Sequence, residues 1–169
     1  PVKRIRFHYL LIDQILDHHI SESLPCLPAI LICEMTGLIC HEAFGHGVEM
    51  DMFVKDRALA KEYVGKYVAS PIVNMRDGAA STVSAGSYFF DDEGVLAGDT
   101  QIIRDGILVA GISDLASATQ LGTVPTGNGR RESSRRKAYA RMTNTFFEKG
   151  SDKLEDMIAS IDHGYMLFE

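Results

Sequence analysis

Residues 36–51 are Thr-Gly-Leu-Ile-Cys-His-Glu-Ala-Phe-Gly-His-Gly-Val-Glu-Met-Asp, and this stretch predicts a helix that carries two histidines. Thr36 offers an N-cap side chain, so we expect the helix to begin there and to run through His41 and His46. Two imidazole rings on one helix can bind a zinc ion. The acid between them, Glu42, can take a proton from the attacking water. The stretch therefore predicts a metal-dependent hydrolytic site.

The spacing of the two histidines does not fit a regular α-helix. Zinc motifs commonly separate their histidines by four residues, which lie nearly one above the other. Five positions turn through about 500°, so the two side chains would diverge by roughly 140° in a regular helix. Gly45 and Gly47 flank His46, and glycine permits a departure from regular winding. We therefore predict an irregular turn at residues 44–47, either a wider π-type turn or a helix end.

The bare motif has limited specificity. The chain has six histidines, and with that number the pattern arises by chance in about one sequence in a hundred. The alternative is a helix whose histidines are merely satisfied by hydrogen bonds. Glu49 lies three residues after His46 and could share its face of the helix. We expect Glu49, and in the same way Asp51, to orient a metal-binding histidine through a hydrogen bond.

Together these residues form the pattern His41-Glu42-x-x-x-His46-x-x-Glu49-x-Asp51, which resembles that of the TldD/PmbA family of metallopeptidases. The likeness covers roughly residues 29–165. It continues in three further segments: Asp91-Asp92-Glu93-Gly94, Pro125-Thr126-Gly127-Asn128-Gly129-Arg130-Arg131-Glu132 and Arg141-Met142-Thr143-Asn144-Thr145. Because both histidines and the glutamate are present, the chain looks like the catalytic TldD-type member. The PmbA/TldE-type partner lacks them.

The resemblance implies that His41 and His46 bind zinc and that Glu42 is the general base. The substrate it implies is a peptide or unfolded polypeptide, extended between the subunits of a homodimer or of a heterodimer with a TldE/PmbA-like subunit. It also implies a third zinc ligand, a cysteine from a later stretch that this chain lacks. One alternative is a non-catalytic peptide-binding or assembly subunit. A regulatory role connected with DNA gyrase, an older label of the family, is a more distant one.

The resemblance also bears on domain organisation, because the family's N-terminal α/β domain is missing here. We expect residues 1–169 to form a single domain, an incomplete C-terminal catalytic domain. The first twenty residues show helical spacing of apolar side chains. Residues 1–28 nevertheless match the family pattern poorly, so we expect them to be a helical lead-in to the domain.

Beyond the motif, the sequence predicts an α+β fold: a mainly antiparallel sheet, the helix with the H-E-x-x-x-H motif and a few flanking helices. Residues 67–75 and 81–90 are rich in Val, Ile, Ser, Thr and aromatic residues, as strands are. Asp105-Gly106, between two apolar segments, predicts a tight hairpin. Ser151 is expected to cap a short helix. The apolar face of that helix would be formed by Leu154, Met157, Ile158 and Ile161.

Six basic residues lie within twelve positions: Arg130, Arg131, Arg135, Arg136, Lys137 and Arg141. Such runs are usually solvated faces. The net charge of the chain is -6, which makes nucleic acid an unfavoured partner. Arg130, Arg131 and Arg141 belong to the family-like segments and are candidates to bind a carboxylate or a carbonyl of a peptide. Asn144 is a candidate to pair with the substrate backbone.

The composition, with 46% hydrophobic and 24% charged residues, is ordinary for a globular protein. No apolar run approaches the roughly 18 residues that suggest a membrane span. The N-terminus lacks the apolar core of a signal peptide. We therefore expect a cytoplasmic protein without membrane contact. The three cysteines, Cys26, Cys33 and Cys40, form no C-x-x-C pair, and we expect them to be buried apolar residues.

Overall fold

The computed structural model describes residues 29–31 and 33–167, so the helix predicted for the first twenty residues lies outside the described part. The helices are α2 (Cys33–Ile39), the π-helix η1 (Cys40–Gly45), the 3-10 helices η2 (His46–Val48) and η3 (Leu59–Tyr63), α3 (Met50–Val54), α4 (Leu115–Leu121) and α5 (Leu154–Ala159). The strands are β1 (Ala29–Leu31), β2 (Met75–Asp77), β3 (Thr100–Arg104), β4 (Ile107–Leu108), β5 (Gly129–Arg130), β6 (Tyr139–Ala140), β7 (Thr145–Phe147) and β8 (Tyr165–Leu167).

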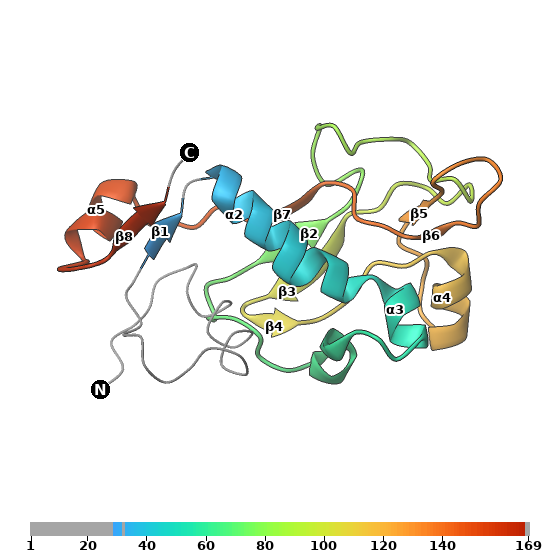
Figure 1. Cartoon of the computed structure of the whole chain (residues 1–169), viewed down its shortest axis with the longest axis horizontal. Coiled ribbons are helices and arrows are strands. Elements are labelled where there is room, and N and C mark those ends of the chain that lie inside the picture. The colour runs from blue at the N-terminus through green and yellow to red at the C-terminus, as the bar shows by residue number, and fades with distance from the viewer. Residues whose placement is uncertain (1–28, 32, 168–169) are drawn as a thin grey trace.

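A four-stranded antiparallel sheet in the order β4-β3-β2-β7 forms the centre of the fold, and the helical run of α2 and η1 lies across it (Figure 1). Strands β5 and β6 form a second antiparallel pair, whereas β1 and β8 pair in parallel. The fold is therefore a mixture of helices and strands with mainly antiparallel pairing, as the sequence predicts.

The hydrophobic core lies between the helical run and the central sheet. The helical side contributes Cys40, Phe44 and Val48. The sheet and its flanking loops contribute further buried side chains: Val68, Ala69, Val73, Met75, Ile102, Ile103, Leu108 and Ile112. Burial of these apolar surfaces removes them from water and so fixes the helical run against the sheet.

The Asp105-Gly106 hairpin is confirmed, since β3 and β4 pair on either side of it. Asp105 has a φ of 49° and Gly106 a φ of 81°, and a two-residue turn with both φ values positive suits the right-handed twist of the flanking strands. A Cβ on Gly106 would lie 2.5 Å from the carbonyl oxygen of Ala69. The turn thus needs glycine for close packing as well as for its dihedral angle.

The strand expected at residues 81–90 is wrong. This segment consists of turns and bends, with Phe90 alone forming an isolated bridge to Leu96. Its serines satisfy the local backbone instead: Ser87 Oγ donates to the Thr82 carbonyl at 2.7 Å and accepts from the Ser84 amide at 3.0 Å. Side chains that bond their own backbone compete with strand pairing. In the segment 67–75, Tyr67 forms a single bridge to Ile107, and only Met75 lies in a strand.

Two helix starts also differ from the sequence prediction. Helix α2 begins at Cys33, so Thr36 lies inside it, and its hydroxyl donates to the Leu31 carbonyl at 3.4 Å. Helix α5 begins after Lys153 without a side-chain cap from any described residue, so Ser151 is not its cap. Within the described ranges, no helix is both long and apolar enough to cross a membrane.

Candidate metal centre

A π-helical turn brings His41 and His46 together. The His46 amide donates to the His41 carbonyl, a bond across five residues that marks the wider winding of η1. The two ring centroids lie 4.9 Å apart with the ring planes at 87°. The predicted departure from regular winding is confirmed, but it is longer than expected: η1 begins at Cys40, and the 3-10 helix η2 follows it to Val48.

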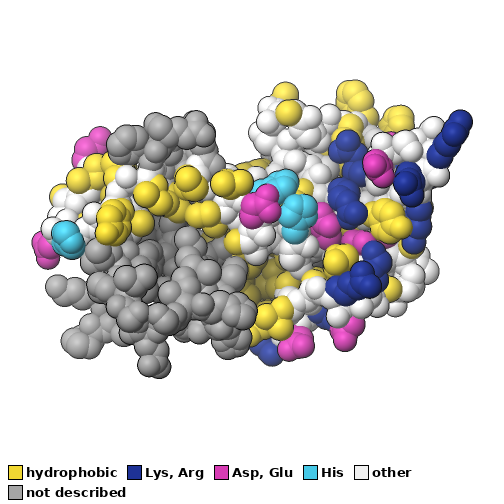
Figure 2. Space-filling view, in the orientation of Figure 1, with side chains coloured by type: hydrophobic (Ala, Val, Ile, Leu, Met, Phe, Trp, Pro, Cys, Tyr) yellow, Lys and Arg dark blue, Asp and Glu magenta, His cyan; other side chains and the backbone are white. Residues whose placement is uncertain are grey.

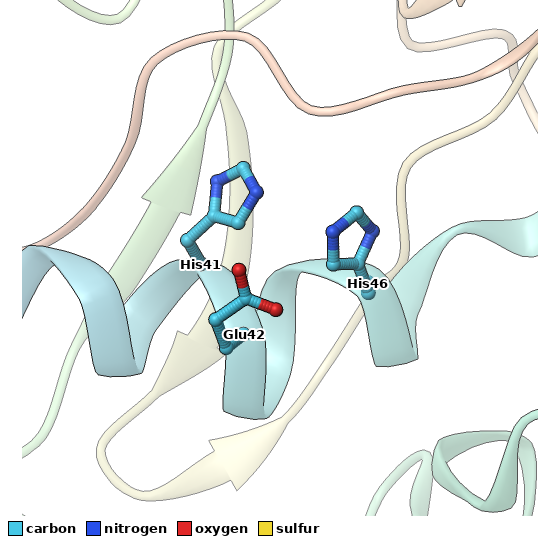
Figure 3. A group of neighbouring side chains, drawn as sticks. All are labelled: His41, Glu42 and His46. Carbon is cyan, nitrogen blue, oxygen red and sulfur yellow. The ribbon is translucent and has the colours of Figure 1, made fainter.

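His41, Glu42 and His46 offer a group of potential metal ligands. One ligand atom from each of these residues lies within 4.8 Å of the other two (Figure 3). All three side chains are exposed, so they can adjust and can meet a substrate. Two imidazole nitrogens are donors that suit zinc, and a carboxylate beside them can serve as the base. The residues present therefore fit the ion that the sequence predicts.

Glu49 occupies the position expected of a residue that orients His46. Its Oε1 lies 3.2 Å from His46 Nδ1, and its Oε2 accepts a hydrogen bond of 3.0 Å from Arg141 Nη1. Burial raises the pKa of the Glu49 carboxyl, while the charges of Arg141 and His46 act in the opposite direction. A histidine whose Nδ1 is held in this way presents Nε2 to a metal.

Asp51 is buried like Glu49, but no contact joins it to either histidine in the described structure. Its Oδ2 accepts a hydrogen bond of 2.8 Å from Lys55 Nζ. Its Oδ1 has no hydrogen-bond partner among the described residues and lies 3.8 Å from Arg141 Nη1. The charge of Asp51 thus acts on Arg141, and it also contributes to raising the pKa of Glu49.

The backbone that follows His46 is held by the segment around Ile112. The Met50 amide donates to the Ile112 carbonyl at 2.8 Å, and the Ile112 amide donates to the Val48 carbonyl at 3.0 Å. Glu49 lies between these two bonds, in an isolated parallel bridge with Ile112. The position of the Glu49 carboxylate is therefore set by a backbone contact with a distant part of the chain.

Cys40 adjoins the histidines in sequence but is turned away from them into the core. Its side chain is fully buried. Burial, with a smaller contribution from the charge of Asp77, raises the pKa of its thiol to about 12. Because a cysteine binds metal as the thiolate, Cys40 is not suited to be a ligand.

The predicted substrate-binding residues fall into two environments. One cavity is lined by three exposed members of this set, Arg130, Arg131 and Arg141. Asn144 is buried and committed to the loop of residues 78–87. Its side-chain nitrogen donates to the Gly78 and Thr82 carbonyls and to Ser87, and its oxygen accepts from the Gly86 amide. The Asn144 side chain therefore stabilises the conformation of this loop.

Sequence reasoning missed Asp77, which organises the segment that carries Arg141. Its fully buried carboxylate accepts hydrogen bonds from the side chain of Asn128 at 2.6 Å and from the amide and hydroxyl of Thr143, both at 3.0 Å. Thr145 also donates to it. Asn128 in turn donates to the Arg141 carbonyl at 3.0 Å. A buried acid with distant partners leaves no periodic pattern in the sequence.

Comparison with known proteins places most of the chain in one family. The family described as the PmbA/TldA metallopeptidase C-terminal domain matches residues 26–169. A metalloprotease TldD homolog from Haemophilus influenzae is 38% identical over 138 residues, which are 82% of this chain and 29% of that protein. A zinc metalloprotease TldD homolog from Saccharolobus solfataricus is 33% identical over 141 residues, 83% of this chain and 31% of its own. The chain thus spans less than a third of the length of these relatives.

Two solved structures share the fold. TldE from Thermococcus kodakarensis superposes with a TM-score of 0.71 at 27% identity, over 83% of this chain and 32% of its own. A protein from Thermotoga maritima, named as a candidate modulator of a DNA gyrase, superposes with a TM-score of 0.73 at 25% identity, over 88% of this chain and 34% of its own.

Proposed function

The chain belongs to the TldD/PmbA family of metallopeptidases, and from this we propose that it supplies the zinc-binding and proton-transferring residues of a peptide hydrolase. The observation that carries the proposal is the π-helical turn, which brings the ligand atoms of His41, Glu42 and His46 within 4.8 Å of one another. The relatives named metalloproteases, and the one named a zinc metalloprotease, support the same activity.

In the proposed mechanism His41 and His46 hold the zinc ion. The family resemblance implies that a cysteine would be the third ligand. When bound, zinc lowers the pKa of water and polarises a carbonyl group. Glu42, exposed beside both rings, takes the proton from the attacking water and later delivers it to the leaving amine. Glu49 and Arg141 keep the His46 ring in position during both steps.

Removal of the Glu42 carboxylate tests the mechanism in the full-length protein together with its partner subunit. We expect Glu42→Gln to abolish peptide cleavage while the protein retains about one zinc per subunit. His46→Ala should lose both zinc and activity. Glu62→Gln, which changes another exposed glutamate in η3, serves as the matched control and should keep both. Normal cleavage by Glu42→Gln would show that the proton is transferred elsewhere.

The alternative is a non-catalytic peptide-binding or assembly subunit of the same family. The structural likeness to TldE favours it as the second candidate. Zinc content separates the two, because a wild-type full-length protein that binds peptides but retains no zinc would be such a subunit. A regulatory role linked to DNA gyrase is third, and its support is the name of the Thermotoga relative. In each case the partner is a second family subunit, the same chain or a TldE/PmbA-like one.

A further inference from the structure

A strongly basic cavity of about 630 Å³ lies beside the candidate metal centre. Its lining consists of Arg130, Arg131, Glu132, Arg135, Arg136, Lys137, Tyr139, Arg141 and Met142. Six of these side chains are cationic and one is acidic, although the whole chain has a net charge of -6. Figure 2 shows histidine side chains near the middle of one face and Lys and Arg side chains gathered to one side of them. Positive charge is thus concentrated where the chain would meet a substrate.

Most of this positive charge is not neutralised by the protein. Among the described residues, the side chains of Arg131 and Arg135 have no acidic partner. The Arg130 Nε atom lies 3.9 Å from Asp92 Oδ2, and Arg136 Nε lies 3.8 Å from Glu132 Oε2. The side chains of both pairs are more than 40% exposed. Ion pairs that are this long and this exposed to solvent interact only weakly, so each arginine keeps most of its positive charge available. The cavity therefore retains a field that favours an anionic ligand.

The cavity is physically connected to the metal centre. Arg141 lines the cavity and also binds Glu49, the residue that contacts His46. Met142, which follows it in the lining, packs against the π-helical turn: a Cβ on Gly45 would lie 1.9 Å from Met142 Sδ. A peptide bound at His41 and His46 would therefore lie close to the cavity.

The Tyr139 ring contacts two of the six cations that line the cavity, Lys137 and Arg141. Its ring centroid lies 5.3 Å from Lys137 Nζ and 5.4 Å from the Arg141 guanidinium carbon, and Lys55 Nζ lies 4.8 Å from the same ring. Contacts of cations with an aromatic face stabilise their positions. The charges are thus partly ordered before a ligand arrives, which lowers the entropic cost of binding.

We propose that this basic cavity is a subsite that binds a carboxylate of the peptide substrate, so that the enzyme prefers peptides with an acidic group near the cleaved bond. The proposal rests on the proposed function, because it assigns a part of the peptide to a cavity next to the metal centre. Arginine side chains such as Arg131 and Arg135 suit a carboxylate, which they can bind through two parallel hydrogen bonds. The net charge of -6 on the whole chain favours a peptide over a nucleic acid.

Binding measurements on the full-length Glu42→Gln protein, with zinc and its partner subunit, test the proposal without requiring cleavage. Four labelled peptides of one sequence carry either Glu or Gln at one position, each with a free or an amidated C-terminus. We expect a carboxylate to tighten binding about tenfold at low ionic strength, and the preference to decline as salt screens the charges. If the Glu peptides bind more tightly than the Gln peptides, the carboxylate in the cavity belongs to a side chain. If the peptides with a free C-terminus bind more tightly than the amidated ones, it belongs to the C-terminus.

Charge reversal locates the effect. In the same background, Arg131→Glu combined with Arg135→Glu should abolish or invert the preference, and the milder pair Arg131→Gln with Arg135→Gln should reduce it. Arg57→Glu, an exposed arginine outside the cavity lining, is the matched control and should leave the preference intact.

Three results would overturn the subsite: equal binding of all four peptides, loss of the preference in Arg57→Glu to the same extent, or a single-stranded oligonucleotide that outcompetes the acidic peptides at this cavity. A protein that shows the preference yet never cleaves a peptide in its wild-type form would refute the hydrolase alone. The carboxylate subsite would then stand as part of a peptide-binding subunit.

Discussion

The Glu49 carboxylate serves two partners from a position that is almost completely buried. One oxygen faces His46 Nδ1 and the other accepts from Arg141, so the charge of the group is shared between a candidate ligand and a cation at the edge of the basic cavity. Residues of this kind fix the orientation of the ring that binds a metal. Through these two contacts, the single residue Glu49 connects the metal centre to the cavity.

The different surroundings of Glu49 and Asp51 predict different effects on zinc binding. Glu49→Gln removes the charge that faces His46, and we expect the zinc affinity of the full-length protein to fall by about tenfold or more. Asp51→Asn removes a buried charge that has no contact with either histidine, and the affinity should remain within about twofold. Competition with a zinc chelator measures both. Equal losses in the two variants would contradict the orienting role of Glu49.

Residue types and spacing predicted which side chains come together at the centre, but not the network beneath it. His41, Glu42, His46 and Glu49 lie within nine positions, so a local helical geometry sufficed to group them. Asp77 is different, because its partners lie 51 to 68 positions away. Whether an acid is exposed or buried among donors depends on tertiary contacts, which no local pattern reports.

At the scale of the element, the glycines predicted the irregular turn but not where it begins. Gly45 and Gly47 lie within the irregular stretch, yet the π-helical winding begins at Cys40. Cys40, Phe44 and Val48 are all buried against the sheet. Packing of these side chains, rather than backbone freedom alone, determines where the winding changes. The hairpin at Asp105-Gly106 was predictable because its turn is specified by the two residues themselves.

The bridge that holds Glu49 leaves no room for a side chain at position 111. A Cβ on Gly111 would lie 2.6 Å from the Val48 carbonyl oxygen, a backbone atom that cannot move without opening the bridge to Ile112. We expect Gly111→Ala to lower the free energy of unfolding by about 1–3 kcal/mol. The same change should weaken zinc binding, since it displaces Glu49. Thermal unfolding and chelator competition measure the two effects.

Gly37→Ala is the matched control for this substitution. Gly37 lies in α2, and none of the described atoms comes within 4 Å of a Cβ built there. Alanine is favoured over glycine inside a helix by about 1 kcal/mol, so this variant should be as stable as the wild type or more so. A Gly111→Ala protein that unfolds at the temperature of Gly37→Ala would refute the close approach.

At the scale of the whole molecule, Asp77 connects three regions that are far apart in sequence. It lies at the end of β2 and accepts from Asn128 in the loop before β5. It also accepts from Thr143, just before β7, and from Thr145, the first residue of β7. Because Asn128 also holds the Arg141 carbonyl, the network places the basic cavity relative to the central sheet. The geometry of the site thus depends on an interior contact well removed from the histidines in sequence.

Removal of the Asp77 carboxylate should therefore cost stability and disturb the site together. Asp77→Ala leaves several buried donors without an acceptor, and we expect the free energy of unfolding to fall by about 3 kcal/mol or more. Hydrogen exchange of the Thr143 amide, which donates to Asp77, should accelerate in parallel. Asp152→Ala, at an exposed aspartate, is the control and should change stability by less than about 0.5 kcal/mol. Similar melting temperatures for the two variants would contradict the connecting role of Asp77.

The π-helical turn has a consequence for how such a motif changes during evolution. A bond from the His46 amide to the His41 carbonyl means that the turn accommodates one residue more than an α-helical turn does. Loss of the codon for Ala43 would leave His-Glu-Phe-Gly-His, in which four-residue spacing and regular winding again put both rings on one side. The helix on either side could keep its register with the core. Motifs with four-residue and with five-residue spacing of the histidines would then differ by the insertion of one residue, which a single helical turn can accommodate.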